Sequence, residues 1–209
     1  MKPMRKPFLV GGFIFAAITA LSLFWYSGTS TPMTHQEIET SMAAIEKQAQ
    51  IFKSPDDLAD FRAFLNQDDG APFYTVNFYK YHPVAQYAEQ HAEGTRASLS
   101  GREAYDRFSN IMIKLLAAQA SHPIFGTDWM AENKSSWDRL VIVRYKSRRA
   151  MAAVFANPEF ANASIHKWAA LENNERFLAQ GLHIPALYMP ALIGALLMGL
   201  LAAWLTVRL

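Results

Sequence analysis

Three polar residues stand on two stretches whose composition otherwise predicts buried strands. Residues 73–81 (FYTVNFYKY) carry Asn77, and residues 137–145 (WDRLVIVRY) carry Asp138 and Arg144. Alternation along a strand places Asp138 and Arg144 on one face of the second stretch. A guanidinium is a forked donor suited to a carboxylate, and an amide can donate to a carbonyl. These residues are therefore candidates for binding a small molecule with an acidic or carbonyl group.

A structural interpretation of the same residues stays open beside this one. Arg144 would pair with an acidic residue, Asp138 being the nearest candidate, and Asn77 would bond to the backbone near the end of the sheet. Buried charges and amides need such partners. His166 is a further candidate, as a general base, because the ordinary pKa of histidine lies close to neutrality.

Motifs for other chemistries are missing from the sequence. The six histidines are scattered and show no His-x-x-x-His spacing, so no metal site is predicted. The chain has no cysteine, which excludes thiol catalysis and thiolate ligands. No glycine-rich nucleotide loop and no Gly-x-Ser-x-Gly elbow occurs, and we expect no cofactor. A formal net charge of +2 gives no reason to propose nucleic acid as a partner.

Two long apolar runs flank the centre of the chain. Residues 8–26 and residues 184–207 contain no charged side chain, and each run has aromatic residues near an end. About 20 apolar residues suffice for a helix to cross a bilayer, and aromatic rings favour its boundaries. The sequence therefore predicts two transmembrane helices. A signal peptide is the alternative for the first run, but the run is longer than usual and no Ala-x-Ala site follows it.

Small residues recur at every fourth position within both runs. Such ridges allow the backbones of two membrane helices to approach closely, either within one chain or between subunits. Chance is the alternative explanation, because small residues are common in membrane helices. The residues that would pack in this way are Gly12, Ala16 and Ala20 in the first run and Ala191, Ala195, Gly199 and Ala203 in the second.

Basic residues next to the two runs predict the orientation of the chain. Lys2, Arg5 and Lys6 precede the first run, and Arg208 follows the second. Both termini are expected in the cytoplasm, which places the centre in the periplasm of a bacterium, at its inner membrane. The predicted organisation is a basic N-terminus (1–7), a first transmembrane helix (8–26), a linker with an amphipathic helix (27–53), a folded domain (54–182), a second transmembrane helix (184–207) and a cytoplasmic C-terminus (208–209).

The central domain alternates strand and helix signals. Strands are expected at residues 73–81, 124–130 and 137–145, and a long helix at residues 100–120 after the capping box Ser100–Glu103. A short helix capped by Ser147 follows, and the capping box Thr34–Glu37 begins the amphipathic helix of the linker. Residues 161–182 are mostly helical in pattern, with a short edge strand near their end. This order predicts an α+β fold of the ferredoxin-like, split βαβ type.

A series of short motifs also occurs in a set order between Ser54 and Gln180. They are DGAP (69–72) leading into VNF (76–78), SGREAY (100–105), WD (137–138), VRY (143–145), SR (147–148), NPEF (157–160) and AALE (169–172). In this order and spacing the chain resembles the domain of unknown function 1330 family, within the dimeric α+β barrel superfamily. The resemblance implies a four-stranded antiparallel sheet, helices on one face, and pairing of two domains through the other face. It implies no particular reaction.

Two functions are consistent with these observations. The first is a membrane-anchored domain outside the cytoplasm that acts as a binding or accessory subunit of a membrane assembly, with a homodimer or other membrane subunits as partners. The second is a cofactor-independent enzyme, of monooxygenase or isomerase type, that acts on a small apolar substrate inside the barrel. This second function rests on analogy of fold and on Asn77, Arg144 and His166.

Overall fold

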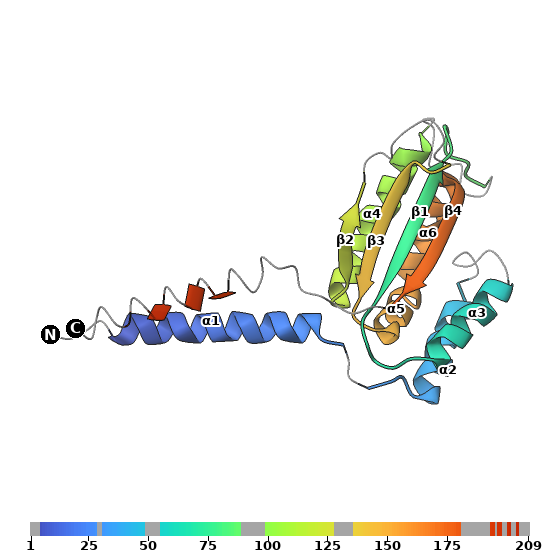
Figure 1. Ribbon diagram of the computed structural model, residues 1–209. Coiled ribbons are helices and arrows are strands. Elements are labelled where there is room, and N and C mark those ends of the chain that lie inside the picture. The colour runs from blue at the N-terminus through green and yellow to red at the C-terminus, as the bar shows by residue number, and fades with distance from the viewer. Residues whose placement is uncertain are drawn as a thin grey trace.

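The computed structural model describes residues 5–28, 31–48, 55–88, 99–127 and 136–180, together with 193, 194, 196, 197, 200, 201 and 204. Its elements follow one another as helices and then alternating strands and helices (Figure 1). In chain order they are α1 (Arg5–Tyr26), α2 (His35–Glu46), α3 (Pro55–Asn66), β1 (Phe73–Tyr81), α4 (Gly101–Ala118), β2 (His122–Gly126), β3 (Arg139–Tyr145), α5 (Arg148–Phe155), α6 (Pro158–Ala170) and β4 (Leu171–Ala179).

The four strands form one antiparallel sheet in the order β2-β3-β1-β4. In the centre, β1 pairs with β3 along its length, with Asn77 opposite Val141, and on its other side with β4. At one edge, β2 is short and its pairing with β3 shifts register between Pro123 and Phe125. This arrangement confirms the α+β class and is consistent with a ferredoxin-like fold.

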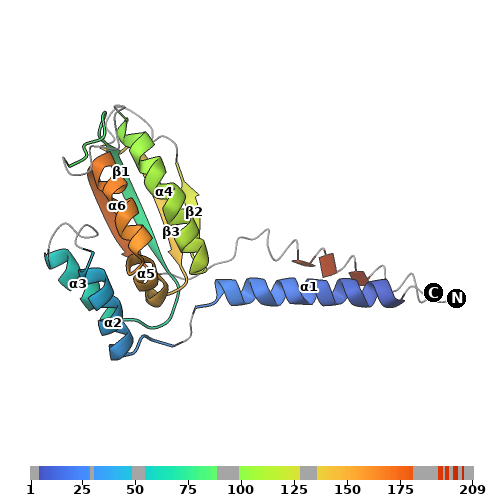
Figure 2. The same ribbon diagram turned by 180° about the vertical axis from the view of Figure 1, so that it is seen from behind.

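Alternation along β1 divides the sheet into two unlike faces. Phe73, Thr75, Asn77 and Tyr79 are buried, whereas the residues between them are only half-buried. The long helices α4 and α6 lie against the buried face (Figure 2), and none of the described helices covers the other face (Figure 1). The helix-covered face therefore carries the core, and the second face is called the open face below.

Capping side chains set the starts of the helices as predicted. Ser100 and Glu103 form a complete capping box at α4, and Thr34 and Glu37 form another at α2. Ser147 accepts a hydrogen bond from the backbone N–H of Ala150 at the start of α5. Such caps satisfy backbone donors that the first turn of a helix leaves unpaired.

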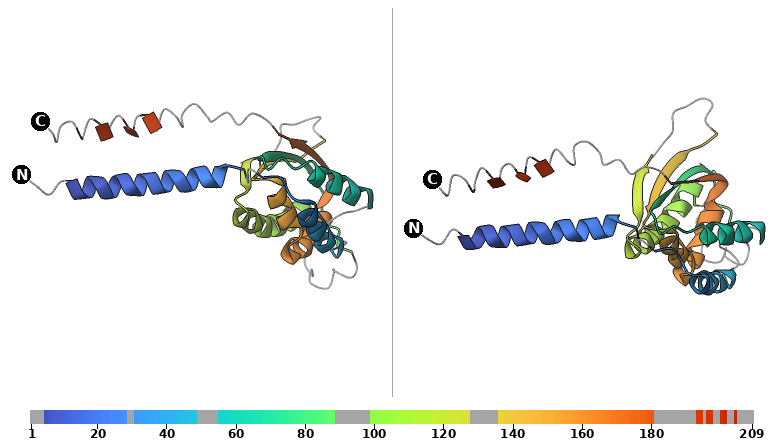
Figure 3. Two further views of the ribbon diagram at one scale, coloured as in Figure 1. Left: turned by 90° about the horizontal axis from the view of Figure 1, so that it is seen from below. Right: turned by 60° about the horizontal axis from the view of Figure 1, so that its bottom comes forward.

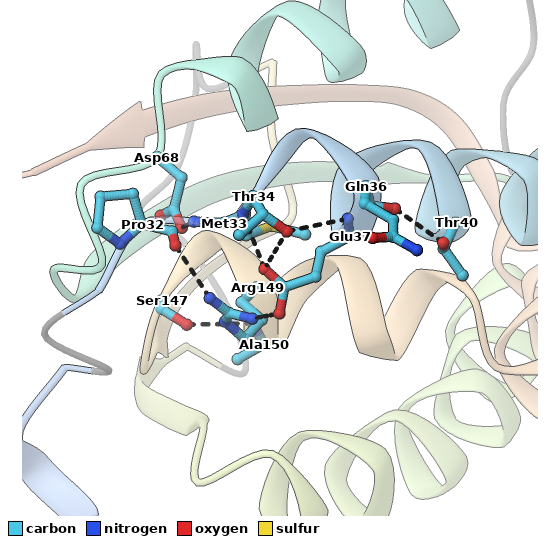
Figure 4. A network of polar contacts seen from close by, with 10 residues as sticks. All are labelled: Pro32, Met33, Thr34, Gln36, Glu37, Thr40, Asp68, Ser147, Arg149 and Ala150. Carbon is cyan, nitrogen blue, oxygen red and sulfur yellow. Dashed lines mark hydrogen bonds and ion pairs between the residues drawn. The ribbon is translucent and has the colours of Figure 1, made fainter.

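A polar network joins the segment before α2 to the domain (Figure 4). The buried carboxylate of Asp68 accepts a hydrogen bond from the backbone N–H of Met33 at 2.8 Å. Arg149 of α5 forms an ion pair with Glu37 and donates to the carbonyl of Pro32 at 3.1 Å. The chain that leaves α1 is thus bonded to the turn before β1 and to α5.

Close backbone packing tightens the same joint. Gly70 has φ +71°, and a Cβ there would lie 2.8 Å from the backbone nitrogen of Thr31. Near the end of α1, Lys146 donates to the carbonyl of Phe24 at 3.2 Å, and its Nζ lies 4.2 Å from the centre of the Phe24 ring. From this joint α1 extends away from the sheet and its helices (Figure 3).

The described side chains of α1 are largely exposed and apolar. Phe13, Leu21 and Phe24 are 76%, 68% and 71% exposed. Six exposed apolar residues follow near the C-terminus: Ile193, Leu196, Leu197, Leu200, Leu201 and Trp204. Within the part of the chain that the structure describes, no helix combines the length and the hydropathy needed to cross a membrane.

The predicted small-residue ridges are only partly visible. Gly12, Ala16 and Ala20 lie on the exposed surface of α1, and no described atom comes within 4 Å of a Cβ built on Gly12. The other four ridge residues, Ala191, Ala195, Gly199 and Ala203, lie outside the described residues. Packing of the two ridges stays a prediction.

The last strand differs most from expectation. The sequence predicts a mostly helical segment with a short edge strand near its end. In the structure, α6 ends at Ala170 and a nine-residue strand, β4, begins at Leu171. The side chains of β4 are mostly exposed, because the strand lies at the edge of the sheet. Alternation of apolar residues, which predicts half-buried strands, is therefore weak in this segment. The strand β2 also begins earlier than predicted, at His122.

Gly101 provides a test of the packing between α4 and the sheet. A Cβ at this position would lie 2.4 Å from the carbonyl oxygen of His82 and 2.5 Å from that of Ala170. Alanine normally stabilises a helix by about 1 kcal/mol over glycine. Here we expect Gly101→Ala to lower the free energy of unfolding by about 1–3 kcal/mol, because both contacts are backbone atoms that cannot move aside.

Thermal and denaturant unfolding would measure this difference. Gly126→Ala is the matched control, since the nearest atoms to its added Cβ are 4.0 Å away. A Gly101→Ala variant as stable as the original chain would contradict the close approach of α4 to these carbonyls.

Candidate functional site

A cavity of about 220 Å³ lies between the helix-covered face of the sheet and α4. Its floor is built by alternate residues of β1 and β3, and its far wall by α4, α5 and α6. The lining is mostly aromatic and aliphatic. Its polar and charged groups are Thr75, Asn77, Ser109, three tyrosines, Arg139, Lys167 and Arg176. An apolar cavity of about 150 Å³ can hold benzene, so this cavity is large enough for a ring-sized ligand.

Tyr79, Tyr105 and Tyr145 place three buried phenols at the cavity. Burial raises the pKa of Tyr79 to about 12, partly offset by a hydrogen bond with Tyr105. The pKa of Tyr105 is raised well above its ordinary value by burial and then by Tyr79, and burial also raises the pKa of Tyr145. At neutral pH these groups are protonated, so they can donate hydrogen bonds but do not accept protons as bases.

Asn77 is the one predicted site residue that reaches this cavity. Its Nδ2 donates to the hydroxyl of Thr75 at 2.9 Å, to the carbonyl of Val141 at 3.1 Å and to the carbonyl of Thr75 at 3.3 Å. Asn77 therefore bonds to the backbone, but in the middle of β1 and not near the end of the sheet. These bonds fix the orientation of the amide within the wall of the cavity.

Arg144 lies on the opposite side of the sheet from Asn77. In the strand register, Arg144 lies opposite Tyr74 of β1 and His122 of β2. Asn77, in contrast, faces the helices together with Val141. The side chain is 1% exposed. The pKa of His122 is lowered first by burial and then by the positive charge of Arg144. Arg144 and Asn77 therefore do not belong to one cavity.

Asp138 is also placed elsewhere. Its carboxylate accepts hydrogen bonds from Lys80 at 2.9 Å and from the backbone N–H of Tyr81 at 2.7 Å. Its own N–H donates to the carbonyl of Tyr79 at 2.8 Å. The predicted pair between Asp138 and Arg144 is wrong, since Asp138 instead holds the end of β1.

His166 lies within α6 and is absent from the described lining of the cavity. Its Nδ1 is 2.8 Å from the hydroxyl of Tyr87, and burial followed by the charge of Arg107 lowers its pKa. The backbone N–H of Gln86, next to Tyr87, donates to the carbonyl of Ala169 at 2.7 Å. His166 thus helps to hold residues 82–88 against α6, away from the candidate site.

A second, more polar cavity of about 400 Å³ adjoins the first. It lies between α3, α5, α6 and β4, and the two cavities share the residues Met151, Phe155, Phe160, Lys167 and Arg176. We call them the inner and the outer cavity. Among the described residues, no group of three or more histidines or acidic residues is placed to hold a metal ion.

The sequence did not predict the charged residues at this shared wall. Arg176 belongs to β4, opposite Asn77 of β1, and can be assigned to the helix-covered face only once β4 is known to pair with β1. Tyr79 could have been found, because alternation places it on the same face as Asn77. Tyr105 carries an apolar ring on the buried stripe of α4, where packing is the simpler explanation.

Comparison with protein-family models finds no match. Comparison with curated proteins finds none either. Among solved structures, a methylated form of the protein RPA0582 is 20% identical, with a TM-score of 0.54, and the alignment covers 65% of this chain and 97% of that chain. A second structure of RPA0582, a protein of unknown function from Rhodopseudomonas palustris, is 20% identical with a TM-score of 0.53 and coverage of 64% and 98%.

These two structures support the fold of the domain. At 20% identity they carry no information on ligand or reaction. A variant of SnoaB, a cofactor-independent oxygenase from Streptomyces nogalater, is more distant, with 16% identity, a TM-score of 0.36 and coverage of 55% and 96%. The resemblance to the 1330 family stays a prediction, whereas the α+β fold with one antiparallel sheet is shown.

The buried phenols predict how stability depends on alkaline pH. The pKa of Tyr79 rises from 10.0 to about 12 on folding, so folding favours the neutral phenol. This contribution is complete below pH 10 and is lost as the pH rises through 12. We expect the free energy of unfolding to fall steadily over this range, as urea unfolding at several pH values would measure.

Absorbance of tyrosinate near 295 nm would follow the same groups directly. Tyr79→Phe should reduce the pH dependence, whereas Tyr74→Phe, on the open face, should leave it unchanged. Ionisation of every tyrosine near pH 10 without loss of structure would contradict the burial of the phenols.

Proposed function

We propose that this protein is a membrane-anchored binding domain whose inner cavity takes a small, mostly apolar ligand. The observation that carries the proposal is the cavity itself, where an apolar lining surrounds a fixed amide and protonated phenols. Few polar groups in an apolar pocket are typical of small-molecule sites, because the apolar lining supplies affinity and the polar groups supply orientation.

Binding is favoured over catalysis by the groups that line the inner cavity. An isomerase or monooxygenase without a cofactor commonly uses a proton acceptor beside its substrate. The described lining contains no histidine, aspartate or glutamate, and His166 lies on another side of α6. The phenols stay protonated at neutral pH, since burial raises the pKa of Tyr79 and Tyr105. The inner cavity is therefore better suited to holding a ligand than to abstracting its proton.

Attachment to a membrane through α1 is supported by the exposed side chains of this helix. Apolar patches of this kind are normally covered by lipid or by another protein. The basic residues Lys2, Arg5, Lys6 and Arg208 favour a domain on the periplasmic side. Removal of α1 as a signal peptide would break a contact with the domain, because Lys146 bonds the carbonyl of Phe24 and lies over its ring.

Pairing of two domains is supported by the open face. Val76 and Phe78 of β1, Ile142 of β3 and Phe177 of β4 share this face, and Phe177 is 50% exposed. The rings of Phe78 and Phe177 meet edge to face at 6.2 Å. We propose that a second copy covers this surface, as the family resemblance implies, so that the accessory role is performed by a homodimer or within a larger membrane assembly.

A pair of neighbouring substitutions tests the inner cavity. Val141 faces the cavity and Ile142 faces away from it. Val141→Phe should fill the cavity, whereas Ile142→Phe is the matched control on the opposite face. For the full-length protein in mild detergent, we expect 2-naphthalenemethanol to bind with a Kd near or below about 1 mM.

Isothermal titration calorimetry would measure this affinity in both variants. We expect Val141→Phe to weaken it about tenfold, the equivalent of about 1.4 kcal/mol, and Ile142→Phe to leave it unchanged. Equal affinities in the two variants would show that the probe binds outside the cavity and would count against the proposal.

Membrane attachment is tested by charges on the exposed surface of α1. Ile18 and Leu21 are 59% and 68% exposed. A lysine within a membrane helix costs about 2.5–3.5 kcal/mol, so the double variant Ile18→Lys, Leu21→Lys should lose most of its binding to phospholipid vesicles in a flotation assay. The control is Val84→Lys, at a 54% exposed apolar residue of the domain. If the double variant floated with the vesicles as well as the original protein, α1 would not be the membrane anchor.

A further inference from the structure

The wall shared by the two cavities has an unusual composition. Its members are three apolar side chains, Met151, Phe155 and Phe160, and two cations, Lys167 and Arg176. The rings of Phe155 and Phe160 stack on each other with their centres 4.6 Å apart. A ligand that rests against these rings would have both cations nearby.

Positive charge predominates in the inner cavity. Its described lining includes Arg139, Lys167 and Arg176 and no acidic residue. Arg139 is offset by Asp106, 3.8 Å away, and stacks on the ring of Tyr105. Among the described residues no carboxylate forms an ion pair with Arg176. The charge of Arg176 reaches the buried phenols, because it lowers the pKa of Tyr145 against the larger effect of burial.

Acidic residues are confined to the outer cavity. Asp57 and Asp60 of α3 and Glu172 of β4 line the outer cavity only. Their charges oppose an anion in the outer cavity but lie beyond the shared wall. An anionic group is therefore favoured at the wall itself, beside Arg176, with the remainder of the ligand in the apolar interior.

We propose that the inner cavity is selective for amphipathic carboxylates, whose apolar ring occupies the space beside Tyr79 and Tyr105 and whose carboxylate binds Arg176, with Lys167 as the second cation. This inference names the class of ligand for the proposed binding function and rests on it. A forked guanidinium suits a carboxylate better than a hydroxyl, because it offers two parallel donors and a full charge. Lys167 adds charge from α6, where its Nζ lies 4.4 Å from the centre of the Trp168 ring.

Two probes of equal shape separate this inference from the proposed function. The first is 2-naphthoate and the second is the neutral 2-naphthalenemethanol, both titrated into the full-length protein in mild detergent at low salt. We expect naphthoate to bind about five- to tenfold more tightly, and the preference to shrink at 0.5 M salt, roughly as screening predicts.

Substitutions of the two cations test whether the shared wall causes the preference for naphthoate. Arg176→Gln should reduce the preference to less than about twofold, and Lys167→Gln should reduce it partly, while Arg176→Lys retains part of it. Lys114→Gln removes the same charge from an exposed position of α4 outside both cavities and should have no effect. Arg176 is exposed on an edge strand, so the fold should tolerate its replacement, and thermal unfolding would verify this.

The outcomes are distinct for the two proposals. Equal affinity for both probes, or a preference unchanged by Arg176→Gln and Lys167→Gln, overturns the carboxylate inference while leaving the binding function in place. Failure of both probes to bind at millimolar concentration overturns the two together. A preference that disappears with Arg176→Gln but not with Lys114→Gln supports both.

Discussion

The pairing of β1 with its two neighbours is the constraint on which the rest of the structure depends. Because side chains alternate along a strand, a shift of one residue would exchange the two faces of the sheet. The observed register places Thr75, Asn77 and Tyr79 beneath the helices and leaves Val76 and Phe78 on the open face. The inner cavity and the proposed dimer surface thus arise from a single choice of register.

Burial then determines what the cavity can do. A phenol enclosed by aromatic and aliphatic groups keeps its proton, as the raised pKa of Tyr79 shows. The side-chain N–H groups of Asn77 donate to Thr75 and Val141, and these bonds make the amide a rigid part of the cavity wall. The charged side chains of the described lining are Lys167 and Arg176 at the far wall and Arg139, whose charge is offset by Asp106. The described lining therefore has no general base.

The sequence predicted those parts of the fold that have strong local signals. The starts of α4 and α2 were predicted from the capping boxes at Ser100 and Thr34, and β1 from its aromatic residues. Each of these signals is contained within a few residues. β4 was predicted only as a short edge strand, since its exposed residues show little alternation. The candidate site was predicted only at Asn77. The positions of Asp138 and Arg144 depend on partners far away in the chain, such as Lys80 and His122, and no local pattern reveals these partners.

The two edges of the sheet differ in a way that bears on unwanted association. At one edge, β2 has only five residues, and its pairing is interrupted next to Pro123, which has no backbone N–H to offer another strand. At the other edge, β4 is nine residues long, with the exposed charges Glu175 and Arg176 along it. Fibrillar growth needs a strand to be added at both edges of every sheet. Because β2 offers a short and interrupted edge to a further strand, this domain resists such growth.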